Sequence, residues 1–177
     1  MRRCVLLFSL ALALSALTAC VSTAPAREGA TFVVVRHGEK ADNSRDPALN
    51  EAGRARAQVL AARLVDAPLV AAYASEYRRT QQTAQPAADG HGLAVAGYGA
   101  AQPAQAFAAQ LRASHRAGTV LVVGHSNTVP AIVAALCGCE TAPMDDSEYD
   151  RLSEVRIDAG GRTRLTITRY GADSASP

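Results

Sequence analysis

Two short apolar runs constrain the fold of this chain most strongly. They cover residues 32–35 and 119–123. Neither shows the alternation of polar and apolar residues that is typical of a strand with one solvent-exposed face. A run of this kind is typical of a strand buried on both faces of a parallel sheet. The stretches between and around them have helical spacing, so strand and helix patterns alternate along the chain. This alternation predicts an α/β fold, a three-layer α/β/α sandwich with a mostly parallel central sheet.

The individual elements follow from apolar spacing, caps and breakers. Strands are expected over 31–36, 69–74, 93–96 and 119–123, and helices over 51–65, from 79 into the high eighties, and over 104–116 and 128–136. Asn50 is a suitable N-cap, and Pro86 is expected to kink its helix or end it early. The arginines of the first helix are expected to face solvent. Alternating segments at 151–157 and 163–169 predict a hairpin at one edge of the sheet.

The beginning of the chain has the features of an export signal. Arg2 and Arg3 precede an apolar run over 5–17, which is shorter than the roughly 20 residues that a membrane-spanning helix needs. The run ends in Leu17-Thr18-Ala19-Cys20, which resembles the lipobox of bacterial lipoproteins. The resemblance implies cleavage before Cys20 and lipid attachment to its thiol. The alternatives are an ordinary secretory signal with an incidental cysteine, or an uncleaved anchor.

This reading divides the chain into four parts. They are a signal peptide over 1–19, a lipidated N-terminus and tether over 20–30, one folded domain over 31–171, and a disordered tail over 172–177. Val21 stands where the lipoprotein pattern of Gram-negative bacteria would need Asp for retention in the inner membrane. We therefore expect lipid anchoring in the cell envelope, on the periplasmic side of the outer membrane if the source is Gram-negative.

Charge and cysteine usage narrow the possible partners. Loss of Arg2 and Arg3 with the signal would take the formal net charge from +2 to zero, so nucleic acid is not an expected partner. Cys137 and Cys139 could form a disulfide in an oxidising compartment or remain two free thiols. The sequence contains no four-ligand metal pattern, and it does not indicate an oligomeric state.

Residues suited to phosphate chemistry follow the predicted strands. Arg36-His37-Gly38-Glu39 follows the first strand, Ser75-Glu76-Tyr77-Arg78-Arg79 the second, and Gly124-His125-Ser126-Asn127 the strand over 119–123. The carboxyl ends of parallel strands meet at one edge of a sheet, so these groups are expected to converge. Guanidinium groups bind phosphoryl oxygens in a bidentate way, and a neutral imidazole can attack phosphorus. The pattern predicts a phosphoryl-transfer site.

These motifs resemble those of the histidine phosphatase superfamily, also called phosphoglycerate mutase-like. Arg36-His37-Gly38 matches its Arg-His-Gly hallmark, and Gly124-His125 matches its second Gly-His. The stretch from Ser75 to Ala84 matches its Ser-x-Leu-x-Arg-Ala-x-Gln-Thr-Ala pattern, with Tyr77 in place of Leu and Thr80 in place of Ala. The resemblance implies a phosphohistidine on His37 and a phosphate pocket of Arg36, Arg79 and His125. It also implies Asn43 as a further phosphate ligand and no cofactor or metal.

The acid that would protonate the leaving group is not evident. Many members of the superfamily carry a glutamate before the second Gly-His, but residues 90–139 of this chain contain no Asp or Glu. The expected donors are the carboxyl groups of a loop over 138–150, namely Asp145, Asp146 and Glu148. Glu39 and Glu76 are weaker alternatives. A further alternative is that no protein acid is used, as in the bacterial phosphohistidine phosphatases of this superfamily.

The sequence therefore predicts a phosphatase that acts on phosphomonoesters or phosphohistidine, with a small phosphorylated compound or a phosphoprotein as substrate. A phosphoglycerate mutase-type phosphotransferase and a catalytically inactive phosphate-binding envelope module are the alternative functions. The rim of the pocket is expected to come from 90–102 and 138–150. These segments lack basic residues, which makes highly phosphorylated substrates less favoured.

Overall fold

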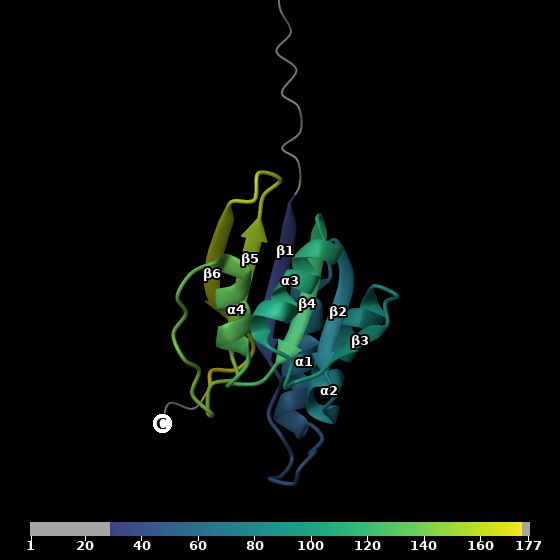
Figure 1. Cartoon of the computed structure of the whole chain (residues 1–177). Coiled ribbons are helices and arrows are strands. Elements are labelled where there is room, and N and C mark those ends of the chain that lie inside the picture. Colours follow the sequence, from purple (N-terminus) through teal and green to yellow (C-terminus); the bar gives the residue numbers. More distant parts are fainter. Residues whose placement is uncertain (1–28, 175–177) are drawn as a thin grey trace, which may run out of the picture.

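The computed structural model describes residues 29–174 of the 177-residue chain (Figure 1). The predicted signal peptide, Cys20 and most of the predicted tether lie outside the described residues. The described part has six strands and four helices: β1 (Ala30–Arg36), α1 (Glu51–Leu64), β2 (Leu69–Ser75), α2 (Arg78–Gly90), β3 (Val95–Tyr98), α3 (Ala104–Ser114), β4 (Gly118–Gly124), α4 (Val129–Cys137), β5 (Arg151–Ile157) and β6 (Thr163–Arg169).

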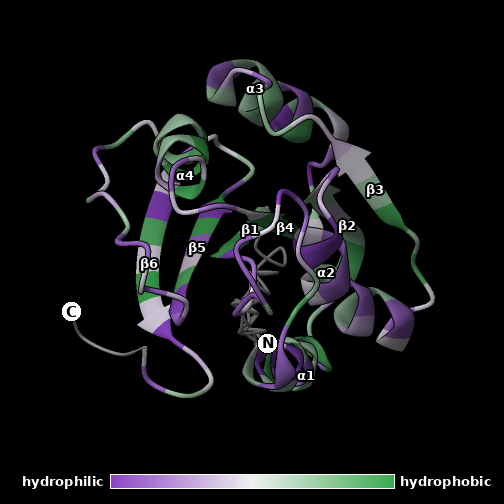
Figure 2. Cartoon of the chain, turned by 90° about the horizontal axis from the view of Figure 1, so that it is seen from below, coloured by the Kyte–Doolittle hydropathy of each residue, from purple (hydrophilic) through white to green (hydrophobic). Residues whose placement is uncertain are grey.

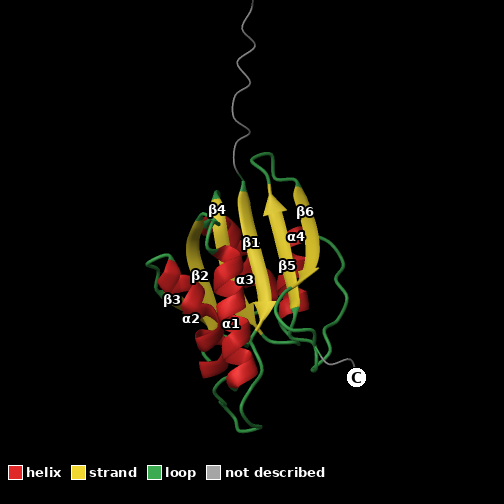
Figure 3. Ribbon diagram, turned by 180° about the vertical axis from the view of Figure 1, so that it is seen from behind, coloured by secondary structure: helices red, strands yellow, loops and turns green. Residues whose placement is uncertain are grey.

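The predicted three-layer sandwich is confirmed. The strands form one sheet in the order β3-β2-β4-β1-β5-β6, in which the first four are parallel and β5 and β6 form the antiparallel edge hairpin. Figure 2 shows α1 and α2 on one side of the sheet and α3 and α4 on the other. Seen from behind, β5 and β6 have no helix in front of them (Figure 3), which fits their half-exposed alternating sequence.

The two central strands divide the core into two apolar layers. Phe32, Val34, Val120 and Val122 face α3 and α4, while the residues between them face α1 and α2. This explains why residues 32–35 of β1 and 120–123 of β4 are all apolar. The two strands pair in register over their full length, from Ala30 opposite Gly118 to Arg36 opposite Gly124. The residues that follow the two strands, His37 and His125, therefore lie at the same edge of the sheet.

The helix that contains Pro86 does not end early, which was one of the two outcomes expected from the sequence. α2 continues to Gly90. Ala84, Ala87 and Ala88 flank the proline and are fully packed against the sheet, and this burial favours the continued helix over the local cost of proline. β3 also begins two residues later than expected. Asn50 caps α1 as predicted, because its Oδ1 accepts a hydrogen bond from the Gly53 amide at 2.8 Å.

One arginine of α1 is buried, so the expectation that all of them face solvent is wrong. Arg56 is 3% exposed. Its Nε and Nη2 bind both carboxylate oxygens of Glu39 at 2.7–3.1 Å, and its Nη1 and Nη2 donate to the carbonyls of Tyr170 and Ala172 at 2.8 Å. A bidentate pair with two further acceptors satisfies a buried guanidinium group. Arg56 therefore fastens the chain after β1 and the C-terminal segment to α1.

The C-terminal segment contacts the domain beyond the predicted boundary at residue 171. Besides the Ala172 carbonyl bound by Arg56, the Ser174 hydroxyl accepts hydrogen bonds from the amides of Tyr149 and Asp150 at 2.7 and 3.0 Å. Residues 172–174, assigned to the tail from sequence, are thus held against the loop that precedes β5. Residues 175–177 lie outside the described part of the chain.

The two cysteines after α4 are joined in a disulfide, Cys137–Cys139. Gly138 lies between them and ends the helix with φ +66°, in the left-handed region that glycine adopts without steric cost. The disulfide fixes the start of the loop over 138–150 to the end of α4. Of the two alternatives that the sequence leaves open, the structure contains the disulfide.

Candidate active site

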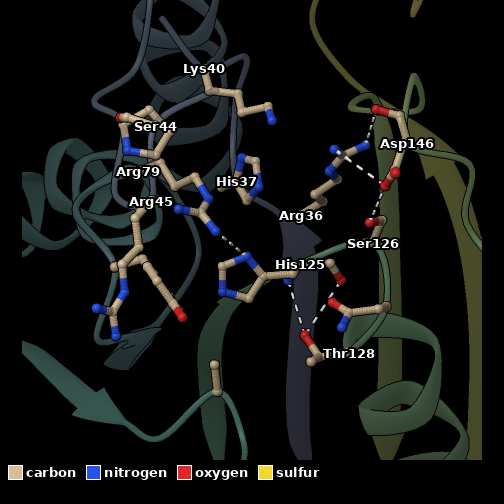
Figure 4. A pocket seen from close by; sticks show the side chains of 14 residues that line it. Arg36, His37, Lys40, Ser44, Arg45, Arg79, His125, Ser126, Thr128 and Asp146 are labelled. Carbon is tan, nitrogen blue, oxygen red and sulfur yellow. Dashed lines mark hydrogen bonds and ion pairs between the residues drawn. The ribbon is translucent and has the colours of Figure 1, made fainter. Parts of the chain in front are cut away.

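The three motif segments converge at the carboxyl ends of β1, β2 and β4. The His37 amide donates to the Gly124 carbonyl at 3.0 Å, which continues the β1–β4 ladder by one residue. The rings of His37 and His125 lie edge to face with their centroids 5.3 Å apart. Arg36 and Arg79 point into the same space from opposite sides (Figure 4). The structure thus brings together the four residues that the sequence singles out.

His37 is held in one orientation and kept neutral. Its Nδ1 lies 2.7 Å from the Gly38 carbonyl oxygen, a contact in which Nδ1 carries the proton and Nε2 keeps its lone pair. The side chain is buried, and burial lowers the pKa of His37 from 6.5 to about 3, with smaller contributions from the charges of Arg36 and Arg79. An unprotonated Nε2 therefore faces the pocket across the physiological pH range.

His125 ends a chain of buried hydroxyl groups. Its Nε2 lies 2.8 Å from Ser75 Oγ, which lies 2.9 Å from Thr80 Oγ1, and Thr80 in turn donates to the Tyr77 carbonyl at 2.7 Å. Its Nδ1 lies 3.4 Å from Arg79 Nη2 and faces the pocket. Burial, followed by the charge of Arg79, lowers the pKa of His125 from 6.5 to about 4. The hydroxyl groups can reverse their hydrogen bonds, so Ser75 can donate to Nε2 while Nδ1–H donates to a ligand.

Arg36 is held by backbone atoms of the loop over 138–150. Its Nη1 donates to the carbonyls of Asp145, Asp146 and Glu148 at 3.1, 2.7 and 3.1 Å. The ring of Tyr149 stacks on the guanidinium group, with the Arg36 Cζ 4.0 Å from the ring centroid. These contacts fix the position of the charge and leave the Arg36 Nε buried without a hydrogen-bond partner within the described residues.

Arg79 is held in a similar way on the opposite side. Its Cζ lies 4.4 Å from the centroid of the Tyr77 ring, and Nη1 is 3.9 Å from an Asp46 carboxylate oxygen. Nε and Nη1 are buried and lack hydrogen-bond partners among residues 29–174. Buried donors without acceptors cost free energy, and an anion that supplies acceptors would recover it. Two arginines with surplus donors around two imidazoles form a site for a tetrahedral anion.

The remaining residues of the α2 motif hold the loop between β1 and α1. The Leu49 amide donates to Gln82 Oε1 at 2.8 Å, and the Gly38 amide donates to Thr83 Oγ1 at 2.9 Å. Gly53 of α1 also packs directly on Gly38, where a Cβ atom would lie 2.8 Å from the Gly53 carbonyl oxygen. α1 and α2 together therefore set the backbone path after His37.

The three proposed acids fall in different environments. Asp146 lines the pocket, where its Oδ1 accepts from Ser126 Oγ at 2.6 Å and lies 3.9 Å from Arg36 Nη2. The Asp145 carboxylate accepts from the amide and hydroxyl of Ser147, and Glu148 pairs with Arg151 and Arg169. Neither of these two lines the pocket. Of the three predicted donors, Asp146 is the one that lines the same pocket as the two histidines.

Asn43 and the predicted rim differ from expectation. The Asn43 side chain is exposed, accepts a hydrogen bond from Lys40 Nζ at 3.1 Å and does not line the pocket. The rim comes mainly from the loop between β1 and α1, which adds Lys40, Ser44 and Arg45 to a cavity of about 520 Å³. The predicted rim segments contribute only Ala100 and Asp146. The expectation of a rim without basic residues is therefore wrong.

Two further observations concern metals and membranes. Within residues 29–174, no three His, Cys, Asp or Glu side chains lie close enough together to hold a metal ion. None of the helices in the same range is long and apolar enough to cross a membrane.

The neutral state of both site histidines predicts a pH-dependent stability. Below pH 6.5 these histidines bind protons in the unfolded chain, whereas in the folded protein they stay neutral down to pH 3–4. The free energy of unfolding should therefore fall as the pH is lowered from 7 to 5, by up to about 1.4 kcal/mol per pH unit for each histidine. Urea unfolding at several pH values should show this, with a smaller slope for His37→Asn. An unchanged slope in that variant would contradict the burial argument.

Fold and site together define a class: an α/β protein with an anion-binding pocket built around two histidines at the carboxyl edge of its sheet. Comparison with known families agrees with it. Residues 32–98 match the family model of the histidine phosphatase superfamily (branch 1). No curated protein matches the chain in sequence.

Solved structures share this fold across most of the chain. The protein histidine phosphatase SixA complexed with tungstate is 20% identical over 78% of this chain and 96% of its own, with a TM-score of 0.62. Mycobacterial glucosyl-3-phosphoglycerate phosphatase is 18% identical over 81% and 99%, also with a TM-score of 0.62. Bacillus stearothermophilus YhfR is 20% identical over 78% and 96%, with a TM-score of 0.61. The family match thus covers residues 32–98, and the structural comparisons, at 18–20% identity, show a shared fold.

Proposed function

We propose that this protein is a phosphatase that hydrolyses phosphomonoesters or phosphohistidine through a phosphohistidine intermediate on His37. The observation that carries the proposal is the state of His37. Its Nδ1–H donates to the Gly38 carbonyl, and its buried, neutral ring lies between two arginines and a second histidine. This is the arrangement that a nitrogen nucleophile requires to attack phosphorus.

The proposed reaction has two steps. In the first, the lone pair of His37 Nε2 forms a bond to phosphorus while the bond between phosphorus and the leaving group breaks, and the departing oxygen or nitrogen takes up a proton. In the second, water attacks the phosphoryl group, the P–N bond breaks and its electrons return to Nε2, and the proton of the water passes to solvent. Inorganic phosphate leaves, and His37 is neutral again.

The neighbouring residues supply charge and hydrogen bonds in both steps. Arg36 and Arg79 neutralise the charge that spreads over the phosphoryl oxygens in the transition state. Once a substrate has replaced Arg79 as the neighbour of Nδ1, Ser75 can donate to Nε2 of His125, and Nδ1–H can donate to the phosphoryl group. The tyrosines that stack on the arginines keep the guanidinium groups in place before the substrate arrives, so little reorganisation is needed during the reaction.

We further propose Asp146 as the group that protonates poor leaving groups, because it is the one carboxylate among the described residues that lines the pocket. Asp146→Asn should lower kcat/KM for an alkyl phosphate by about 10²-fold. The effect on p-nitrophenyl phosphate, whose leaving group needs no proton, should be less than about threefold. Asp145→Asn is the matched control, since its carboxylate binds Ser147 outside the pocket. Equal losses on both substrates would reject the acid role.

The overall proposal is tested with the purified protein and p-nitrophenyl phosphate. Steady hydrolysis, together with a ³²P-labelled protein trapped by rapid alkaline denaturation, would support it. A P–N bond to histidine survives alkali and is lost in acid, which distinguishes it from a phosphoserine. Interconversion of 2- and 3-phosphoglycerate without net phosphate release would instead indicate the mutase.

We also propose that the protein is lipid-anchored through Cys20 in the cell envelope. The lipobox-like Leu17-Thr18-Ala19-Cys20 supports this, as does the Cys137–Cys139 disulfide, which suits an oxidising compartment. Cells that express the protein should incorporate labelled palmitate into it, and Cys20→Ser should abolish the label. Label retained in that variant would reject lipidation at Cys20.

A further inference from the structure

The loop between β1 and α1 brings two cations into the pocket that the proposed phosphoryl chemistry does not use. Lys40 and Arg45 line the same cavity as His37 and His125. Figure 4 shows Lys40, Ser44 and Arg45 on the side of His37 and Arg79, with Ser126 and Asp146 opposite. These residues are close to the reacting centre, yet none of them belongs to the motifs that position the phosphoryl group.

Neither cation is neutralised by a carboxylate within the described residues. Lys40 Nζ makes its hydrogen bond to the neutral amide of Asn43, and the Arg45 side chain has no carboxylate partner among residues 29–174. The three acidic residues of the loop are engaged elsewhere. Glu39 pairs with Arg56 of α1. Asp42 accepts from the Ser44 amide, and Asp46 accepts from the Arg78 amide and faces Arg79. Both charges therefore remain available to a ligand.

The loop is held in place, so its cations have a defined location. Lys40 and Leu49 form an antiparallel bridge, and the Ala41 amide donates to the Ala48 carbonyl at 2.9 Å. The base of the loop is also tied to α2, because the Leu49 amide donates to Gln82 Oε1. A loop closed at its base in this way presents side chains at a fixed edge of the pocket, which lowers the ordering cost of binding.

The charge balance of the cavity indicates what these cations bind. The lining residues carry four positive charges and a single negative charge, on Asp146. A phosphomonoester dianion engages the two motif arginines, which leaves Lys40 and Arg45 without a counter-charge. The cavity, at about 520 Å³, holds a small substrate. The ring of Tyr77 is stacked by Arg79 and meets the His125 ring edge to face.

We infer that the substrate is a small phosphorylated compound with a second anionic group, a carboxylate or another phosphate, held by Lys40 and Arg45. This inference rests on the proposed phosphatase activity and narrows its substrate class. The scissile phosphoryl group lies between Arg36 and Arg79, and the second anion lies under the β1–α1 loop. The two cations select the substrate without taking part in the transfer.

The test compares substrates that differ only in the second charge. 3-Phosphoglycerate and glycerol 3-phosphate form one pair, in which a carboxylate replaces a hydroxymethyl group; propane-1,3-diol bisphosphate and its monophosphate form the other. We expect kcat/KM to favour the member with the second anion by about tenfold or more in at least one pair. Which pair shows the preference distinguishes a carboxylate from a phosphate.

Substitutions of Lys40 and Arg45 test whether these residues cause the preference for a second anion. The double substitution Lys40→Ala/Arg45→Ala should reduce the ratio of kcat/KM within the preferred pair by about tenfold or more. Because a ratio is measured on one preparation, it does not depend on how much of a variant folds. Arg78→Ala is the matched control, since Arg78 is an exposed cation outside the cavity, and its ratio should equal that of the unchanged protein.

The failures of the two proposals can be told apart. Ratios near one in the unchanged protein, or a ratio that survives the double substitution, would overturn the second-anion site and leave the phosphatase standing. A protein that hydrolyses neither p-nitrophenyl phosphate nor any member of the two pairs would overturn the phosphatase itself, and the substrate class with it.

Discussion

His37→Ala is expected to lower kcat/KM for p-nitrophenyl phosphate by about 10⁴-fold or more, because the variant has no group that can form the phosphorylated intermediate. The neighbouring residues cannot replace it. Nδ1 of His125 faces the pocket, but the Ser75 hydroxyl fixes the ring and Arg79 donates toward that nitrogen. The measurement is steady-state hydrolysis together with ³²P incorporation, and both signals should disappear.

His91→Ala serves as the matched control for this prediction. His91 lies at the end of α2, where Nε2 is 2.9 Å from the Leu64 carbonyl, and it does not line the pocket. Loss of that hydrogen bond should cost about 1 kcal/mol of stability and leave kcat/KM within about twofold. If His37→Ala retained more than a few per cent of the activity while His91→Ala behaved as expected, the nucleophile would have to be another residue.

Arg79→Lys should lower kcat/KM by about 10²- to 10³-fold although the charge is kept. Lysine cannot reproduce the planar guanidinium group that stacks on Tyr77 and presents donors from three nitrogens. The loss should appear mainly in kcat, since the bidentate contacts strengthen as charge spreads over the phosphoryl oxygens.

The adjacent arginine provides a demanding control. The Arg78 side chain is exposed. Its backbone amide donates to Asp46, and this hydrogen bond is kept when the side chain is changed. Arg78→Lys should leave kcat/KM within about twofold of the unchanged protein. Comparable losses in both variants would mean that general positive charge, and not the geometry of Arg79, supports catalysis.

The sheet and the central residues of the site could be predicted from sequence for a clear physical reason. Residues 32–35 of β1 and 120–123 of β4 are buried between two helical layers, so all of them are apolar, and the strands can be located from composition alone. Parallel strands then place His37 and His125 at one edge. The α2 motif was also informative, because Gln82 and Thr83 must hold the loop while Arg79 faces the pocket.

Other features leave no such trace in the sequence. The contribution of the β1–α1 loop to the pocket rim cannot be predicted from composition, because the course of this loop depends on hydrogen bonds to α2. Asp145 and Glu148 looked equivalent to Asp146 until their partners, Ser147 and Arg151, were known. The burial of Arg56 depends on Glu39 and on two carbonyls over 100 residues away. The stacking of Tyr149 on Arg36 likewise has no local signal.

The attachment of Arg36 has a consequence for how this site can change over time. Its three acceptors in the loop over 138–150 are main-chain carbonyls, which every amino acid possesses. Apart from Tyr149, which stacks on the guanidinium group, and the proposed acid Asp146, side chains of that loop can therefore be exchanged without releasing the arginine, provided that the backbone keeps its course. The loop is for that reason a natural place for substrate preference to drift, or to be re-engineered, while the machinery beneath it stays intact.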